Sequence, residues 1–307
     1  MATAARLVRG EQQKQIVKRI EEMAGRMSAW EIWQDFIVLS ALAISNSVDR
    51  EHRETREKEY MRRASRYTRE EMQRFPEMLA LVVSALEENQ DQDFLGDLFM
   101  CLGLGDQWKG QFFTPYCICK AMAKLNSNEQ IEQEIAEKGW ISVNDPACGA
   151  GALLLAFANE VRERGINYQE RVLFIAQDID YLAGMMCYIQ LSLLGCPVYV
   201  VVADTLAHPG TCLDERGLLP RPGENVWKTP MFFRDCWTWR RMMSMGGIKG
   251  EKENMRRLSV LVTAQTLYNL AKLADMDGGN EGRVIDKLVR DRMLLLRDAE
   301  RIGRRHE

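Results

Sequence analysis

The chain has 307 residues, of which 46% are hydrophobic and 28% are charged, and its formal net charge is −3. This length suits one large α/β domain with a helical addition, and the near-neutral charge excludes a general electrostatic attraction to nucleic acid. With three histidines and no Cys-x-x-Cys pair, a zinc site is not favoured, and no apolar run approaches the length of a membrane span. We expect a cytoplasmic protein without a metal or a membrane anchor.

The first third of the chain predicts helices. Residues 10–46 carry apolar side chains at helical spacing, which indicates two helices. Residues 49–74 mix Arg and Glu with few large apolar residues, which favours a solvated helix or linker with i,i+4 ion pairs over a DNA-contacting segment. Thr68 and Glu71 fit a capping box, so another helix should begin there. We therefore assign residues 1–108 to a helical N-terminal region.

From residue 109 to residue 307 the pattern indicates an α/β domain. Apolar strands are expected at 141–144, 172–176 and 198–202, and helices are expected at 151–163 and 181–194. Strands that are apolar throughout and alternate with helices predict a doubly wound parallel sheet covered on both faces. A loop over 207–224 precedes one further strand at 259–262 and an amphipathic helix at 282–303.

The turn after the first strand is the most informative motif. It reads Asp145-Pro146-Ala147-Cys148-Gly149-Ala150-Gly151 and is called the glycine turn below. Its glycines let the backbone pass close to a ligand, and the helix that follows offers unpaired N–H groups. A dinucleotide site requires a third glycine where Leu154 stands, and Asp145 would repel a diphosphate. An acid at this position can pair with a cationic amino group, such as that of S-adenosylmethionine (SAM).

Aspartates follow the ends of three consecutive strands: Asp145, Asp178 and Asp204. In an open parallel sheet, ligands bind at this edge. Asp178 is placed to accept hydrogen bonds from ribose hydroxyls, with Ile179 beside it in the same cofactor site, and Asp204 could accept one from an adenine amino group. The alternative is that these aspartates only cap the following helices. Three in succession, the first within a glycine turn, favour a SAM pocket.

The motifs resemble, in their order, those of adenine-specific DNA methyltransferases, and they are most similar to the modification subunit of type I restriction–modification systems. The matching segments are Gln111-Phe112-Phe113-Thr114-Pro115, the glycine turn, Gln177-Asp178 and Asp204-Thr205-Leu206. Residues 93–99 are similar to a helix that precedes these motifs in the family, so the likeness covers about residues 90–206. It implies a SAM-dependent methyltransferase Rossmann-like fold, preceded by an α-helical region.

The resemblance also implies a role for each matching residue. Gln111, Phe113, Thr114 and Pro115 would close over the methionine part of SAM; Asp145, Ala147, Gly149 and Gly151 would hold its amino-acid end; Asp178 would bind its ribose and Asp204 its adenine ring. The implied reaction transfers the SAM methyl group to the exocyclic amine of a flipped-out adenine in DNA. The implied partners are DNA and a separate specificity subunit.

One motif of the family is missing. The family places Asn-Pro-Pro-Tyr or Asn-Pro-Pro-Phe after its fourth strand, and this chain has no such string. The nearest segment is Thr229-Pro230-Met231-Phe232, in which a hydroxyl replaces the amide. Thr229, Pro230 and Phe232 are therefore the candidate catalytic residues, with a plain loop as the equal alternative. Only 75 residues follow Phe232, which leaves no room for a DNA-recognition domain as well as the rest of the sheet.

Two main hypotheses follow from the sequence. The first is an adenine-specific DNA methyltransferase. The second is a catalytically inactive SAM-binding or DNA-associated protein that keeps the methyltransferase fold. A methyltransferase with another substrate is a third reading.

Overall fold

The computed structural model describes residues 10–102, 113–127, 129–223, 225–248, 264–277, 284–285 and 287–289. By their internal contacts the residues separate into two compact units, Met1–Gly250 and Glu251–Glu307. The second unit contains helix α13 (Ala264–Asp277). The strand expected at 259–262 and most of the helix expected over 282–303 lie outside the described residues. In the described part of the chain, no helix is both long enough and apolar enough to cross a membrane.

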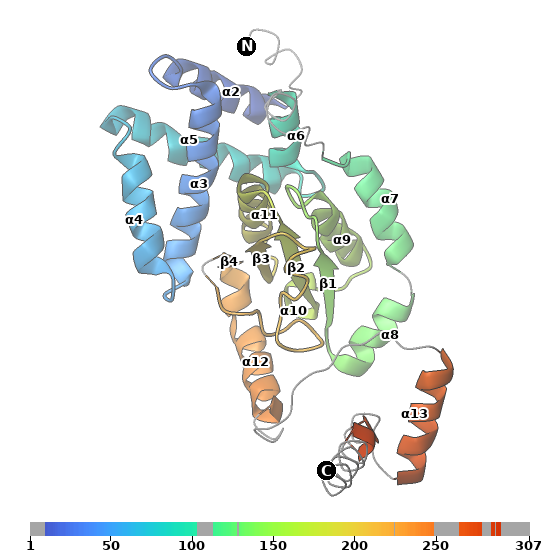
Figure 1. The fold of residues 1–307 in the computed structure, drawn as a ribbon. Helices are drawn as coiled ribbons and strands as arrows, with labels where there is room; N and C mark the ends of the chain where they lie inside the picture. Colours follow the sequence, from blue (N-terminus) through green and yellow to red (C-terminus); the bar gives the residue numbers. More distant parts are fainter. Residues whose placement is uncertain are drawn as a thin grey trace, which may run out of the picture. The chain divides into compact units, whose positions relative to one another are not determined.

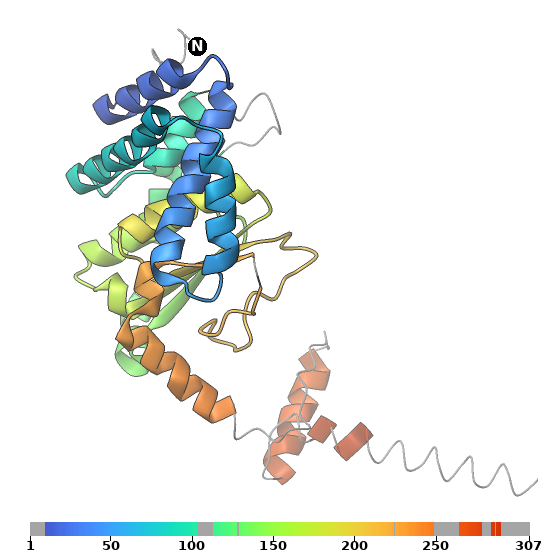
Figure 2. The same ribbon diagram turned by 90° about the vertical axis from the view of Figure 1, so that its left-hand side faces the viewer.

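The N-terminal part of the first unit is helical, as predicted. Its helices are α2 (Glu11–Met23), α3 (Ala29–Val48), α4 (Arg53–Ala64), α5 (Arg69–Glu88) and α6 (Phe94–Cys101) (Figure 1). The expected capping box begins α5, because the Thr68 hydroxyl accepts from the Glu71 amide while the Glu71 carboxylate accepts from the Thr68 amide. Helix α3 is buried along most of its length and lies beside α4 (Figure 2). It also packs on a helix of the sheet domain, which joins the two regions.

The sheet has four strands in the order β1 (Ile141–Asp145), β2 (Val172–Asp178), β3 (Val198–Val202) and β4 (Val226–Lys228). The first three strands are parallel, and β4 runs antiparallel to β3. Helix α9 (Ala152–Glu163) joins β1 to the short helix α10 (Tyr168–Arg171), and α11 (Tyr181–Leu193) joins β2 to β3. The predicted strands and helices are confirmed to within two residues.

Both faces of this sheet are covered, as its apolar strands predict. One face, with Phe174 and Val200, packs against α9 and α11 in a core that extends into the N-terminal helices. The opposite face forms a smaller core around Tyr199. Leu218, Phe232 and Trp237 close this core from the loop after β3, the short helix η1 (Pro230–Phe233) and helix α12 (Asp235–Ile248). The loop after β3, η1 and α12 thus cover this second face together.

Strand β4 is protected by a network of charged side chains at the start of α4. The buried Arg56 guanidinium donates to the Asp49 carboxylate at 2.8 Å and to the Val226 carbonyl at 2.7 Å, and it lies 3.9 Å from the centre of the Trp227 ring. Because an edge strand exposes unpaired backbone groups, this arginine satisfies part of that edge.

The same network explains a group of possible metal ligands. Asp49, Glu51 and His52 bring ligand atoms within 4.8 Å of one another. However, Asp49 already pairs with Arg56, and Glu51 pairs with Lys228 at 2.8 Å. We therefore interpret the group as an ion-pair network between the helical region and β4.

Replacing Arg56 by Met is expected to lower the free energy of unfolding by about 3 kcal/mol, because it leaves the buried Asp49 carboxylate without its guanidinium. Burial alone would raise the pKa of Asp49, but the hydrogen bond from His52 and the charge of Arg56 hold that pKa below its ordinary value. Since the pKa is lower in the folded state, the stabilisation is present at neutral pH and is lost as the pH falls below about 4.

Denaturant unfolding of the wild type and Arg56→Met at pH 7 and at pH 3 measures this effect. The difference in stability should be smaller at pH 3. Arg53→Met, at an exposed position on the same helix, is the matched control and should change little at either pH. A difference that is the same at both pH values would contradict the ion-pair assignment.

Candidate functional site

The carboxyl ends of the three parallel strands bring Asp145, Asp178 and Asp204 to one edge of the sheet. Asp145 is the last residue of β1 and Asp178 the last of β2, and both are buried. The backbone continues the pairing beyond β1, since the Cys148 amide donates to the Gln177 carbonyl at 2.9 Å. The glycine turn therefore lies over the end of β2.

Asp178 is oriented by two backbone amides. Its Oδ2 accepts from the Gly149 amide at 2.8 Å, and its Oδ1 accepts from the Asp180 amide at 2.8 Å. Each carboxylate oxygen can accept more than one hydrogen bond, so both retain capacity for a ligand. The side chain is thus a fixed acceptor at the mouth of the glycine turn.

Asp145 adds a second negative charge to this edge. Its Oδ1 accepts from the Ala147 amide at 3.1 Å. Burial raises the pKa of Asp145, the hydrogen bond from Ala147 opposes this, and the nearby charge of Asp178 raises it further. Neither carboxylate forms an ion pair with any described residue. An anion would be repelled here, whereas a ligand with hydroxyl and ammonium donors would reduce the electrostatic repulsion between the two carboxylates.

Gly149 and Gly151 allow two different side chains to approach the turn closely. Gly149 has φ 54°, and a Cβ atom at this position would lie 3.0 Å from the Phe113 ring. Gly151 has φ 97°, and a Cβ atom there would lie 2.9 Å from the Cys187 sulfur on α11. The first glycine therefore admits Phe113 against the turn, and the second lets α11 approach it closely.

The other predicted cofactor residues lie around this turn. Thr114 and Pro115 are exposed just before α7 (Tyr116–Asn126), and Ala147 is exposed within the turn. Ile179 is 71% exposed beside the buried Asp178. Gln111 lies outside the described residues.

Asp204 is half-buried at the end of β3, and its Oδ1 accepts from the Leu206 amide at 2.9 Å. This aspartate therefore caps its own turn, as the alternative interpretation expected. A further contact links this turn to β1, since the Thr205 hydroxyl donates to the Pro146 carbonyl. The ends of β1 and β3 are thereby joined across the edge.

The candidate catalytic segment lies elsewhere. Thr229 is fully buried; its hydroxyl donates to the Cys196 carbonyl at 2.7 Å and accepts from the Val198 amide at 3.0 Å. Cys196 and Val198 stand at the amino end of β3. Because β4 runs antiparallel to β3, the chain that leaves β4 returns to the edge opposite Asp178. We therefore correct the expectation that Thr229 lies beside the cofactor site.

Pro230 and Phe232 share this placement. Both belong to η1, which follows directly after Thr229. The Phe232 ring is buried 6.0 Å from the Tyr199 ring, and the Arg241 guanidinium covers it at 3.9 Å. A ring that is only 3% exposed offers no free face for a flipped base, so this segment acts as part of the second core.

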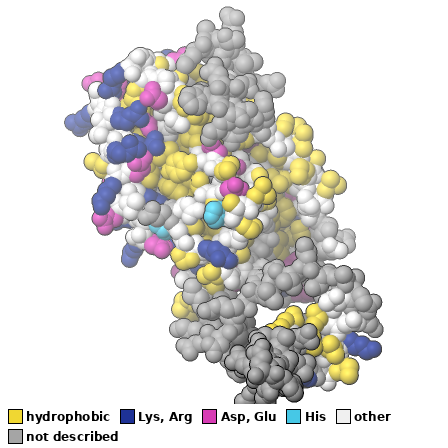
Figure 3. Space-filling model, viewed as in Figure 1, with side chains coloured by type: hydrophobic (Ala, Val, Ile, Leu, Met, Phe, Trp, Pro, Cys, Tyr) yellow, Lys and Arg dark blue, Asp and Glu magenta, His cyan; other side chains and the backbone are white. Residues whose placement is uncertain are grey.

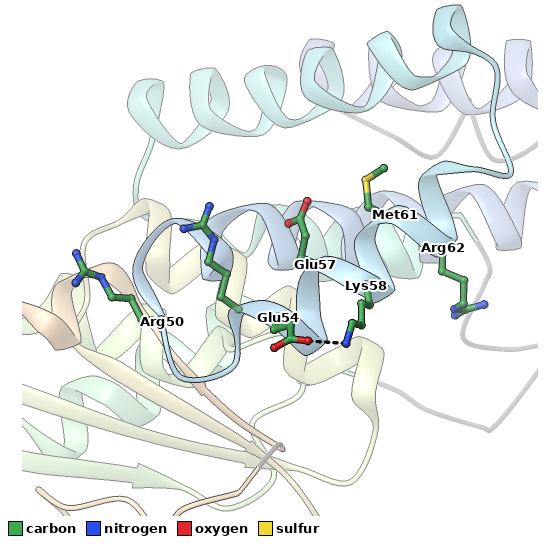
Figure 4. A pocket seen from close by; sticks show the side chains of 7 residues that line it. Arg50, Glu54, Glu57, Lys58, Met61 and Arg62 are labelled. Atoms are coloured by element: carbon green, nitrogen blue, oxygen red, sulfur yellow. Dashed lines mark hydrogen bonds and ion pairs between the residues drawn. The ribbon is translucent and has the colours of Figure 1, made fainter.

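A hollow of about 710 Å³ lies on α4 and the turn before it. Figure 4 shows that its walls come from one helix and the turn before it, with Lys58 paired to Glu54 at 2.7 Å. In Figure 3, basic and acidic side chains are interspersed on this side of the molecule. The predicted ion-paired, solvated helix is confirmed. Because acidic and basic side chains alternate on it, its surface favours neither an anionic nor a cationic ligand.

The structure also reveals a residue that the sequence analysis did not assign. Gln190 is fully buried in the otherwise apolar helix α11, and its Nε2 donates to the Ala150 carbonyl within the glycine turn at 2.9 Å. A lone amide in an apolar helix is the signal that could have indicated it, because a buried amide needs partners.

Three parallel strands that alternate with helices, with a glycine turn and acids at their carboxyl edge, are consistent with the Rossmann-like fold of SAM-dependent methyltransferases. Residues 101–238 match the family model described as N-6 DNA methylase. This match confirms the predicted resemblance over these residues. No curated protein and no solved structure gave a match.

Replacing Gly151 by Ala is expected to lower the free energy of unfolding by about 2 kcal/mol, since it combines an unfavourable φ with overlap of the Cys187 sulfur. Gly165→Ala is the control, because Gly165 also has a positive φ but has open space around it. That variant should lose only about 1 kcal/mol. Urea unfolding compares the two, and equal losses would contradict the assigned role of the Cys187 contact.

Proposed function

We propose that the chain binds SAM at the carboxyl edge of its sheet and transfers the methyl group to the exocyclic amine of adenine in DNA. The observation that carries the proposal is the convergence of Asp145 and Asp178 on the glycine turn. The match to the N-6 DNA methylase family model supports it and makes DNA the expected partner.

The chemistry of the acceptors supports SAM over a phosphate-bearing cofactor. SAM has ribose hydroxyls and an ammonium group to offer to the two carboxylates, and it has no phosphate. We assign the ribose of SAM to Asp178 and its adenine ring to Ile179 and Asp204. Its amino-acid end is assigned to the glycine turn, at Asp145, Ala147, Gly149 and Gly151. Its methionine part is assigned to the segment before α7, at Gln111, Phe113, Thr114 and Pro115. When bound, SAM supplies an electrophilic methyl group on its sulfonium.

The chain's own residues would contribute orientation and exclusion of water. The two backbone hydrogen bonds to Asp178 hold its carboxylate ready, so little reorganisation accompanies binding. Phe113 covers the glycine turn and would limit the access of water to the methionine part. DNA specificity is assigned to a separate subunit or to the helical N-terminal region.

A second candidate function is a SAM-binding or DNA-associated protein without methyltransferase activity. Two observations favour it: the sequence lacks an Asn-Pro-Pro-aromatic string, and Thr229 has a buried position at the opposite edge. Transfer of a labelled methyl group from SAM to adenine in DNA separates the candidates. Methylated adenine supports the enzyme, and SAM binding without methylation supports the inactive protein.

The proposed cofactor is tested by calorimetric titration of the full chain with SAM. Wild-type protein should bind saturably, and Asp178→Ala should weaken binding at least about 100-fold, because the ribose acceptor and the partner of the Gly149 amide are both lost. Asp180→Asn, which keeps a capping side chain for α11, is the matched control and should bind like the wild type. No binding by wild-type protein at millimolar SAM would contradict the proposal.

A further inference from the structure

We propose that helix α6 positions the glycine turn for cofactor binding through two contacts. One is the buried Asp93–Gln190 pair, and the other is the packing of Phe99 against Phe113. The inference rests on the proposed function, since the ligand it concerns is SAM.

Gln190 is the link between α6 and the turn. Its Nε2 donates to Asp93 Oδ1 at 2.8 Å and to the Ala150 carbonyl at 2.9 Å, and its Oε1 accepts from the Leu95 amide at 3.0 Å. With both ends of the amide engaged, its orientation is determined. The peptide between Gly149 and Gly151 is therefore held at a fixed place relative to the first turn of α6.

Asp93 is the N-cap of α6 and is almost completely buried. Its Oδ1 also accepts from the Gly96 amide at 3.0 Å, and a Cβ atom at Gly96 would overlap the carboxylate. Burial raises the pKa of Asp93 to about 6, against the hydrogen bonds from Gln190 and Gly96, while the charge of Asp97 adds to the rise. Asp93 forms no ion pair within the described residues.

Capping alone does not require this costly arrangement. A serine caps a helix as well as an aspartate, without a buried charge. The distinguishing property of this side chain is that it serves the Gly96 amide and Gln190 with the same oxygen. We therefore interpret Asp93 as a positioning residue that acts through Gln190.

The second contact approaches the turn from the Phe113 side. The Phe99 and Phe113 ring centres are 5.3 Å apart, and Phe113 in turn lies against Gly149. Phe99 also packs against Trp30 and Trp33 of α3, at 6.2 and 6.5 Å between ring centres. The helical N-terminal region thus reaches the cofactor turn through a continuous series of packed rings.

The experiment compares SAM affinity and stability in four variants of the full chain, each titrated well below its melting temperature. Gln190→Met removes the amide at nearly constant volume and should weaken SAM binding about tenfold, because the turn is no longer held. Asp93→Ala should have a similar effect. Asp93→Asn keeps an acceptor and should restore affinity to within about threefold of the wild type. Phe99→Leu should weaken binding severalfold.

Tyr199→Phe is the matched control. It removes a buried hydrogen bond to the Gly217 carbonyl on the opposite face of the sheet, so it should lower the melting temperature without changing SAM affinity. This control separates loss of stability from loss of positioning.

The outcomes distinguish the two proposals. If the wild type does not bind SAM, the proposed function fails. If the wild type binds and folded Gln190→Met and Phe99→Leu bind equally well, the positioning inference is overturned while the cofactor site stands. If Gln190→Met does not fold, Phe99→Leu and the difference between Asp93→Asn and Asp93→Ala decide. Equal affinity of the two Asp93 variants would also overturn the inference.

Discussion

The hydrogen bond from the Gly149 amide to the Asp178 carboxylate is the contact on which the proposed cofactor edge depends. It joins the loop that leaves β1 to the last residue of β2, so the two strand ends act as one site. It also brings the charge of Asp178 close to Asp145, and both acids are buried without a described cation. Two buried acids at this edge favour a ligand that carries hydrogen-bond donors over one that carries a phosphate.

The helical N-terminal region serves the sheet at two places. Arg56 binds the backbone of β4 and the Trp227 ring, which anchors the far side of the sheet. Asp93 and Gln190 hold the glycine turn at the other end of the same region. These buried, hydrogen-bonded groups join the helical region to the sheet within one compact unit. A structural change in the helical region would therefore alter the position of the glycine turn at the proposed cofactor edge.

The antiparallel direction of β4 has a functional consequence. A parallel strand would have carried its following loop to the cofactor edge, whereas β4 carries Thr229 and Phe232 to the amino edge. There the threonine hydroxyl is used by the backbone of β3, and the ring fills the second core. The match to the N-6 DNA methylase family model and the proposed cofactor edge support methyl transfer, while the group that would hold the target base has no counterpart in this segment.

Local patterns in the sequence were sufficient for the elements and for the cofactor motif. The strands over 141–145, 172–178 and 198–202, the cap at Thr68 and the glycine turn all follow from short-range rules of periodicity, capping and positive φ. The sequence also predicted that three aspartates would lie at one edge of the sheet, because parallel strands align their carboxyl ends.

Only the tertiary structure decided the contacts between distant segments. In the sequence, Gln190 is only a polar residue within an apolar helix. Its hydrogen-bond partners, Asp93 and Ala150, lie 97 and 40 residues away along the chain, and only the fold brings them into contact with it. From the sequence, Thr229 could substitute for the missing motif. The antiparallel direction of β4 instead places it at the opposite edge of the sheet. That direction depends on which strand edge and which apolar surface the chain meets after a long loop, and these are properties of packing rather than of any short segment.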